Sequence, residues 1–164
     1  MKIIVCMKQV PATTQVEIDP ETGSMKRSGS STRTNPYDLF ALEAALRIRE
    51  KTGGTVTALT MGPDQAVTMM KDAYAMGADE AVILSDRKFA GSDVLATSFT
   101  LSQGIRALGG ADLIICGKQT TDGDTSQVGP ALAEHLHIPH CAWVSGLVCV
   151  DGEKIQVKQE LGEV

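Results

Sequence analysis

The 164-residue sequence predicts an α/β fold: a doubly wound, mostly parallel sheet with helices on both faces and a C-terminal β-hairpin. Short apolar runs rich in β-branched residues alternate with longer segments of helical period, and this alternation repeats four times. Polar residues gather after each apolar run, where the carboxyl ends of parallel strands would border a common crevice. We expect a single domain over residues 1–164.

The first strand is predicted over residues 2–7 and is followed by a long polar stretch, 9–34. Within that stretch, QVEID and SMKRS flank the turn PETG and predict a small hairpin. A helix is predicted over 37–51, with Asn35 as its N-cap and Pro36 at its first position. Its expected buried stripe consists of Leu39, Phe40, Leu42, Leu46 and Ile48.

Three more strand-helix units and a terminal pair of strands complete the prediction. Strands are predicted over 55–61, 80–85 and 112–117, helices over 64–77, 94–108 and 126–137, and the hairpin strands within 141–150 and 154–160. Met69, Met70 and Met76 of the second helix are expected to pack under the sheet.

Charge and apolar run length restrict the possible partners. The formal net charge is −5, so the diffuse basic surface typical of nucleic-acid-binding proteins is absent, and no nucleic-acid partner is expected. No apolar run approaches the roughly 20 residues that span a bilayer, so we expect no membrane insertion and a cytoplasmic protein. The four cysteines lack C-x-x-C spacing, and we interpret them as reduced thiols.

The segment GKQTTDGDTSQVGP, residues 117–130, is the strongest candidate site. About eight polar residues separate Gly117 from Thr125, whereas an ordinary strand-to-helix connection takes about 2 to 6. Glycines let a backbone approach a ligand closely, and the start of the following helix would present free amides to a phosphate. The alternative is that Asp124 or Thr125 only caps that helix. Neither a Walker motif nor G-x-G-x-x-G is present.

Other candidates are weaker. His135, His137 and His140 do not predict a metal site, because residues 135 and 137 point to different helix faces. Cys6 is interpreted as a small hydrophobic residue at a strand end. No Ser/His/Asp or Cys/His set is arranged for nucleophilic catalysis, so we predict no catalytic residues.

Five blocks resemble the β subunit of electron transfer flavoprotein: VCMKQVP, NPYDLFALEAAL, TMGPDQA, AYAMGADEAVILSDR and GKQTTDGDTSQVGPALAEHL. They occur in the family's order and cover nearly the whole chain. The resemblance implies a Rossmann-like sheet of the adenine nucleotide alpha hydrolase type. It also implies an electron carrier that works as a heterodimer with an α subunit and exchanges electrons with acyl-CoA or other dehydrogenases.

The resemblance also implies a cofactor, which is AMP in ordinary members and a second FAD in flavin-bifurcating ones. The block SDRKFAGSDVLATS is similar to bifurcating members, so FAD is favoured, with AMP as the alternative. In that branch the flavin accepts a hydride from NADH and sends its two electrons along separate routes. The cofactor-binding residues implied are Cys6, Lys8, Asn35, Pro36, Tyr37, Asp38, Met61, Arg87, Asp93, Leu95, Ala96, Thr97, Gly117, Lys118, Gln119, Thr120, Thr121, Asp122, Gly123, Asp124, Thr125, Ser126, Gln127 and Val128.

Within that set, the loop from Gly117 to Val128 would cradle the phosphates, and Arg87 would place a cation near the flavin ring. For Arg87 the alternative is a solvated loop charge. A different class of protein also stays open: a stand-alone adenine-nucleotide-binding sensor resembling universal stress proteins. We do not favour an adenylating hydrolase, because the sequence contains no set of catalytic residues for that reaction. Since β subunits of the family continue well past this point, we also expect that the sequence is C-terminally truncated.

Overall fold

The computed structural model describes residues 1–12, 31–151 and 154–162. The hairpin predicted from QVEID and SMKRS therefore lies outside the described residues. The strands are β1 (Lys2–Cys6), β2 (Gln9–Pro11), β3 (Thr32–Thr34), β4 (Thr55–Met61), β5 (Glu80–Leu84), β6 (Leu113–Cys116), β7 (Val144–Val150) and β8 (Ile155–Gln159). The helices are α1 (Pro36–Thr52), α2 (Val67–Met76), α3 (Val94–Ala107) and α4 (Val128–Leu136), with single 3₁₀ turns η1 (Asp64–Ala66) and η2 (Arg87–Phe89).

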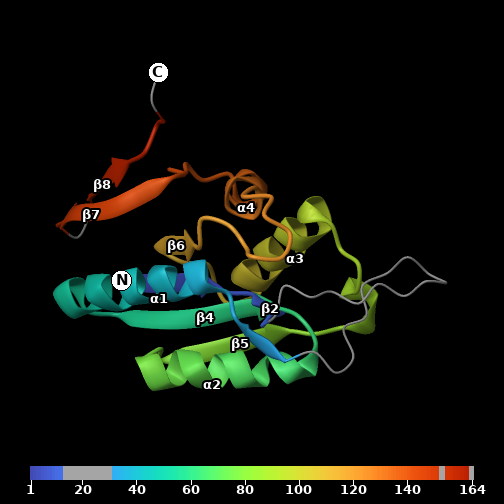
Figure 1. Ribbon diagram of the computed structural model, residues 1–164. Helices are drawn as coiled ribbons and strands as arrows, with labels where there is room; N and C mark the ends of the chain where they lie inside the picture. The colour runs from blue at the N-terminus through green and yellow to red at the C-terminus, as the bar shows by residue number, and fades with distance from the viewer. Residues whose placement is uncertain (13–30, 152–153, 163–164) are drawn as a thin grey trace.

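The central sheet is parallel and has the strand order β5-β4-β1-β6 (Figure 1). The chain moves outward from β1 through β4 to β5 and then returns to place β6 on the other side of β1. Strand order therefore reverses between β1 and β6, which is the point where open α/β sheets leave a crevice at the strand carboxyl ends. The predicted doubly wound parallel sheet is confirmed.

The sheet has a hydrophobic core on each face, built from side chains that alternate along the strands. Ile3 and Val5 of β1 pack with α1 and α2 on one face, in a cluster that includes Leu42 and Met69. On the other face, Ile4 and Cys6 pack with Leu101 and Ile105 of α3 and Leu132 of α4. Successive strand residues point to opposite faces, so one apolar run serves both layers.

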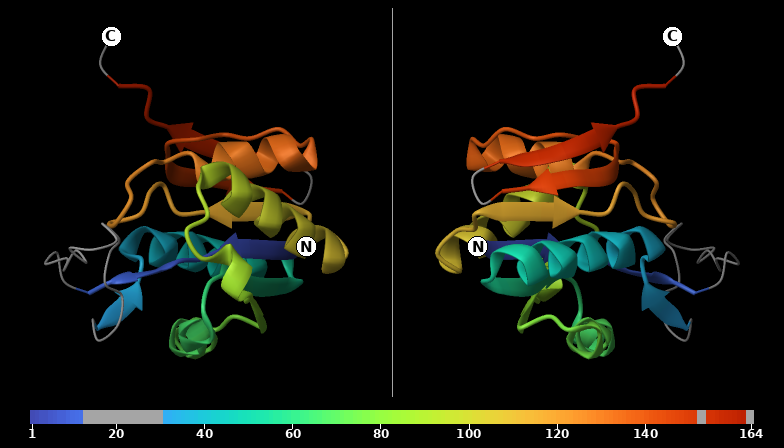
Figure 2. Two further views of the ribbon diagram at one scale, coloured as in Figure 1. Left: turned by 90° about the vertical axis from the view of Figure 1, so that its right-hand side faces the viewer. Right: turned by 90° about the vertical axis from the view of Figure 1, so that its left-hand side faces the viewer.

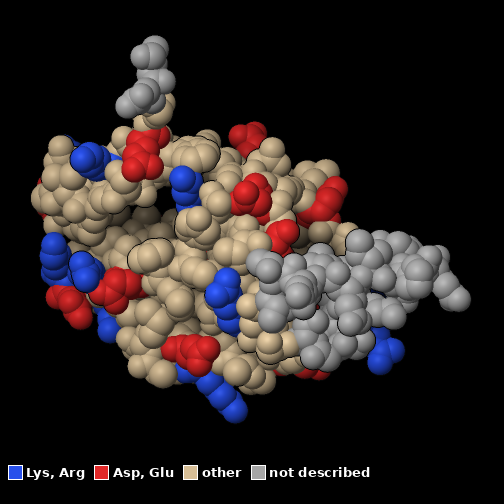
Figure 3. Space-filling view, viewed as in Figure 1, with Lys and Arg blue, Asp and Glu red and all other residues tan. Residues whose placement is uncertain are grey.

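Strands β7 and β8 form the predicted C-terminal hairpin, paired antiparallel. The hairpin lies on the β6 side of the sheet, with α2 at the opposite end of the molecule (Figures 1 and 2). Leu147 and Val150 of β7 pack against the cluster under α1. A groove of about 700 Å³ lies between α1 and β7, and this side of the molecule is hollowed there (Figure 3).

Some predicted boundaries and burials are wrong. Phe40 is 74% exposed and lines the groove, because Ala41, Leu42, Ala45 and Leu46 form the buried stripe of α1 instead. Met76, which the sequence predicts to pack under the sheet, is the last residue of α2 and is 39% exposed. The helix predicted over 64–77 divides into η1 and α2. None of the helices in the described ranges is long and apolar enough to cross a bilayer.

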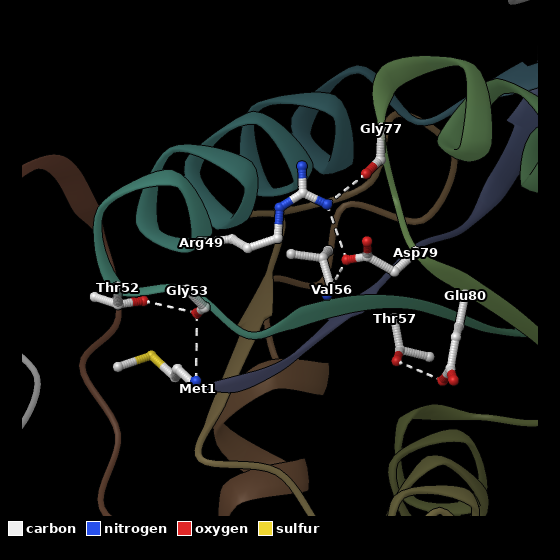
Figure 4. A network of polar contacts seen from close by, with 9 residues as sticks. All are labelled: Met1, Arg49, Thr52, Gly53, Val56, Thr57, Gly77, Asp79 and Glu80. Atoms are coloured by element: carbon white, nitrogen blue, oxygen red, sulfur yellow. Dashed lines mark hydrogen bonds and ion pairs between the residues drawn. The ribbon is translucent and has the colours of Figure 1, made fainter.

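The amino edge of the sheet, opposite the crevice, is held by side chains (Figure 4). The Asp79 carboxylate accepts hydrogen bonds from the backbone N–H of Val56 and from Arg49 Nη1, each at 2.8 Å. Arg49 also donates to the Gly77 carbonyl at 2.8 Å. Helix α1, strand β4 and the start of β5 are thus joined at one point. The hydrogen bond from Val56, followed by that from Arg49, lowers the pKa of Asp79.

Candidate functional site

The candidate site lies where β1, β6 and the start of α1 meet, at the strand-order reversal where open α/β sheets bind their ligands. We call this carboxyl-end region of the sheet the crevice. Cys6 and Cys116, the last residues of β1 and β6, are directly paired, so the chain segments that follow them leave the sheet side by side. The Lys8 N–H donates to Asp38 Oδ2 at 2.7 Å, and the Asn35 N–H donates to the Lys8 carbonyl at 2.9 Å. These two bonds fix the first turn of α1 against the β1 exit.

Position 117 requires glycine because the chain there approaches the start of α1 closely. A Cβ atom built at this position would overlap Asp38 Oδ1 and would lie 2.8 Å from the Tyr37 carbonyl carbon and 2.9 Å from the Asp38 nitrogen. These backbone atoms of α1 cannot move aside without displacing the helix. The β6 exit and the start of α1 are therefore in direct contact, with room for glycine alone.

Asp38 is a buried carboxyl at the centre of this contact, with 4% of its surface exposed. Burial raises the pKa of Asp38 to about 6. Hydrogen bonds from the Lys8 amide, the Asn35 side chain and the Gly117 amide, with the charge of Lys8, act in the opposite direction and limit the rise. The carboxyl thus changes its protonation state near pH 6.

Asn35 occupies the N-cap position of α1 as predicted, but its side chain does not cap the helix. Instead, Asn35 Nδ2 donates to the Gln119 carbonyl at 2.8 Å and holds the long loop against α1. The residue is fully buried, and among the described residues its Oδ1 has no hydrogen-bond partner. A buried amide oxygen without a partner is costly, so this atom is an open acceptor in the crevice wall.

The long loop is also tied to the β1 exit by an ion pair. Lys8 Nζ lies 2.7 and 2.6 Å from the two carboxylate oxygens of Asp122. Burial acts to raise the pKa of Asp122, but the bond and charge of Lys8, with bonds from Thr120 and the Gly123 amide, hold it below its ordinary value. Lys8 is thus anchored at the mouth of the crevice with 46% of its side chain exposed.

The loop that precedes α4 contains residues with left-handed backbone conformation. Asp124 and Ser126 have φ angles of 54° and 56°, and Gln127 follows with φ −114° and ψ −17°. Successive residues of opposite handedness align neighbouring N–H groups into an anion-binding concavity. The helix begins at Val128 rather than at residue 126, and no side chain caps it. The alternative that Asp124 or Thr125 serves only as its N-cap is therefore wrong.

The remaining predicted residues lie at the exits of β4 and β5, on the same rim. Met61 ends β4, and Arg87 is an exposed residue of η2. Asp93 caps α3, accepting a hydrogen bond from the Ala96 amide at 2.8 Å, and Leu95 beside it is 65% exposed. Described contacts join Lys8, the start of α1 and the loop into one cluster. None of the described hydrogen bonds or ion pairs joins this second group to it.

One contact at the site was not predicted. Lys118 Nζ lies 4.1 Å from the centre of the Trp143 ring, just before β7. The sequence carries no signal for this cation–π contact, because it joins the loop to a residue on a later element. The structure also pairs Cys6 with Cys116, which the sequence spacing does not indicate.

A parallel α/β sheet with a cluster of polar contacts at its strand-order reversal defines the class of open α/β proteins, which bind ligands at the strand carboxyl ends. Comparison with known proteins gives the family within that class. The electron transfer flavoprotein domain model matches residues 22–163. The chain belongs to the electron transfer flavoprotein family, and the curated proteins that it matches include β subunits and FixA proteins.

Three relatives illustrate the similarity. Protein FixA of Sinorhizobium fredii is 49% identical over 155 residues, which are 92% of this chain and 54% of the relative. The electron transfer flavoprotein subunit beta of Clostridium acetobutylicum is 48% identical over 159 residues, 97% of this chain and 61% of the relative. The caffeyl-CoA reductase-Etf complex subunit CarD of Acetobacterium woodii is 48% identical over 160 residues, with the same shares. The chain thus spans about three fifths of the length of these relatives.

Proposed function

We propose that the chain is the nucleotide-binding part of an electron transfer flavoprotein β subunit and that it binds FAD, with AMP as the alternative ligand, in the crevice described above. The observation that carries the proposal is the cluster of Lys8, Asn35, Asp38 and the 117–127 loop at the point where strand order reverses. Ligands of open parallel sheets bind at this point, and both nucleotides contain an adenosine phosphate.

The chemistry of the crevice fits such a ligand. The aligned amides at Ser126 and Gln127 and the uncapped start of α4 suit a phosphate, as does the exposed ammonium of Lys8. The open acceptor Asn35 Oδ1 suits a ribose hydroxyl or an adenine amino group. These residues bind and orient the nucleotide, and the isoalloxazine ring of FAD would supply the electron transfer.

The redox part of the proposal concerns the exits of β4 and β5. Arg87, exposed on η2, would place a positive charge near a flavin ring and favour its reduced forms. Asp93, Leu95, Ala96 and Thr97 at the start of α3 would line the ring side of the crevice. We propose that a flavin bound here would accept a hydride from NADH and that its two electrons would then leave along separate routes. The motif similarity noted in the sequence supports it.

The proposed partners are an electron transfer flavoprotein α subunit and an acyl-CoA or other dehydrogenase. Relatives bearing the name subunit beta, and CarD as a subunit of a caffeyl-CoA reductase-Etf complex, support this proposal. An exposed apolar surface near the crevice, with Leu95 at 65% and Phe99 at 52% exposure on α3, is available for such contacts.

Equilibrium dialysis with FAD, AMP and ATP tests the proposal. We expect FAD to bind more tightly than AMP, and Lys8→Met and Asp122→Asn to weaken FAD binding about tenfold, the loss of one charge-assisted contact. Lys71→Met, which removes an exposed lysine from α2, is the matched control and should bind as the wild type does. An FAD affinity that is unchanged in both the Lys8→Met and the Asp122→Asn variants would contradict the assigned crevice.

Reconstitution with an α subunit tests the redox part. Two flavins per heterodimer would support the FAD-binding carrier, and one flavin with one AMP would support the ordinary carrier. ATP binding without any flavin would instead identify a sensor of the universal stress protein type. The flavin count is measured by absorbance after release of the cofactor.

A further inference from the structure

Two thiols lie side by side at the floor of the crevice. Cys6 and Cys116 end the neighbouring strands β1 and β6 and are paired in register. Both belong to the cluster that contains Ile4, Leu59 and Leu132, so their side chains point to the same face of the sheet. In-register pairing on one face makes these two cysteines a vicinal dithiol, although 109 residues lie between them in the sequence.

The strand geometry brings the pair within bonding range. Neighbouring strands lie about 4.8 Å apart, and disulfides join residues whose Cα atoms are roughly 4.4–6.8 Å apart. The neighbouring Cys116 thiol, followed by burial, raises the pKa of Cys6. Both residues lie at strand ends, where the backbone can adjust more easily than in the middle of the sheet.

The two thiols differ in access. Cys6 is 8% exposed, whereas Cys116 is only partly buried. Gly129 of α4 faces Cys116, and even a Cβ atom at position 129 would lie 3.8 Å from the Cys116 sulfur. Helix α4 therefore packs closely against Cys116 on this side. Because Cys116 is more exposed than Cys6, a small reagent reaches Cys116 first, while Cys6 is placed to react second.

We propose that Cys6 and Cys116 form a redox-sensitive dithiol that a low-molecular-weight aliphatic disulfide oxidises to an intramolecular disulfide. The Cys116 thiolate, after releasing its proton to solvent, attacks one sulfur of the reagent and expels a thiolate, leaving a mixed disulfide on Cys116. The Cys6 thiolate then attacks the Cys116 sulfur and expels the second thiolate. Two protein thiols are oxidised, and one reagent disulfide is reduced to two thiols.

The bond would join the two chain segments that form the crevice. Gly117 follows Cys116 directly, and Lys8 lies two residues after Cys6, so oxidation would constrain both the loop and the β1 exit. A change in nucleotide affinity on oxidation follows from this geometry, and this consequence alone rests on the proposed function. The dithiol chemistry itself requires no nucleotide.

Peptide mapping tests the proposal on the protein without added nucleotide. Trypsin places Cys6 in peptide 3–8, Cys116 in peptide 107–118, and Cys141 and Cys149 together in peptide 119–154. After treatment of the native protein with hydroxyethyl disulfide and quenching, we expect a disulfide between peptides 3–8 and 107–118. The double variant Cys141→Ser/Cys149→Ser removes the two exposed cysteines and should form the same bond.

Two single variants establish the order of attack. Cys6→Ser should accumulate the reagent adduct on Cys116, whereas Cys116→Ser should leave Cys6 unmodified while the protein is folded. Native wild-type protein in which Cys116 stays unmodified, or carries the adduct without linking to Cys6, would overturn the proposal. Adducts confined to Cys141 and Cys149 would do the same.

A dithiol-specific ligand gives a second measurement that needs no variant of either residue. Phenylarsine oxide condenses with two neighbouring thiols, forming two arsenic–sulfur bonds and releasing water. In the Cys141→Ser/Cys149→Ser background we expect one equivalent to bind per chain and to protect both peptides from alkylation. Zero equivalents on the folded protein would contradict the vicinal arrangement.

Discussion

Asp38 shows how strongly one residue can link the crevice to the solvent pH. Its carboxyl is buried, and its pKa of about 6 lies well above the ordinary value of 3.8. Because the folded-state pKa is raised, the ionised form destabilises the fold. The contribution of Asp38 to stability is therefore most favourable where its carboxyl is protonated, and this contribution falls as pH rises from about 4 through about 6.

The variant Asp38→Asn removes this titration. The raised pKa corresponds to about 3 kcal/mol, at about 1.4 kcal/mol per pKa unit. As pH rises from 4 to 7, we expect the unfolding free energy of the wild type to fall relative to that of the variant by up to this amount. Urea unfolding followed by circular dichroism measures the difference, and a difference independent of pH would refute the assignment.

Gly117 is the second residue on which the crevice depends. Gly117→Ala places a methyl group against the Asp38 carboxylate and the backbone of α1, so we expect a loss of roughly 1–3 kcal/mol of stability. Gly123→Ala is the matched control in the same loop, because a Cβ there meets only Thr120 Oγ1 at 3.8 Å. Equal stability of the two variants in chemical denaturation would show that the contact is not tight.

The elements are tied together at the two opposite ends of the sheet. At the carboxyl end, the loop is tied to β1 by Lys8–Asp122 and to α1 by Asn35. At the amino end, Asp79 joins β4 to α1 through Val56 and Arg49. The second link is structural and should not affect ligand binding, because it lies at the edge of the sheet away from the crevice.

Asp79→Asn separates these two roles. The pKa of Asp79 is lowered in the fold, so its contribution to stability is present above the ordinary value of 3.8 and is lost as pH falls through the lowered pKa. We expect the variant to lose about 1 kcal/mol at pH 7, since the ion pair is partly exposed. Thermal unfolding at pH 7 and at pH 3 checks this expectation: the loss should shrink at the lower pH, and a constant loss would contradict it.

Periodicity predicted which segments become strands and helices, because local sequence decides those choices. It did not predict the exposure of Phe40, since the packed face of α1 is fixed by the small side chains Ala41 and Ala45 against the sheet. It also placed the start of α4 too early. Asp124 and Ser126 adopt left-handed backbone conformations, so the helix cannot begin before them. Because Asp and Ser also occur in many other conformations, their presence in the sequence does not predict this one.

Across the whole molecule, the proposed site depends on a strand order that the sequence patterns do not reveal. Alternating units indicate a parallel sheet, but only the structure shows that β6 returns to the side of β1 and places Gly117 beside Asp38. The polar loop could therefore be recognised from its length and composition. Its three partners are Lys8, which pairs with Asp122, Asn35, which donates to Gln119, and Asp38, which lies against Gly117; they come from distant segments that only long-range pairing brings together.

The most direct test of the account is a hydrogen-exchange footprint of the protein with and without FAD. We expect slowed exchange in the 117–127 loop, in the segment after β1 that contains Lys8, and at the start of α1, with the β7–β8 hairpin unchanged. The Lys8→Met variant should lose this protection at the same ligand concentration. Protection confined to the hairpin or to α2, with the loop unaffected, would contradict the crevice as the nucleotide site.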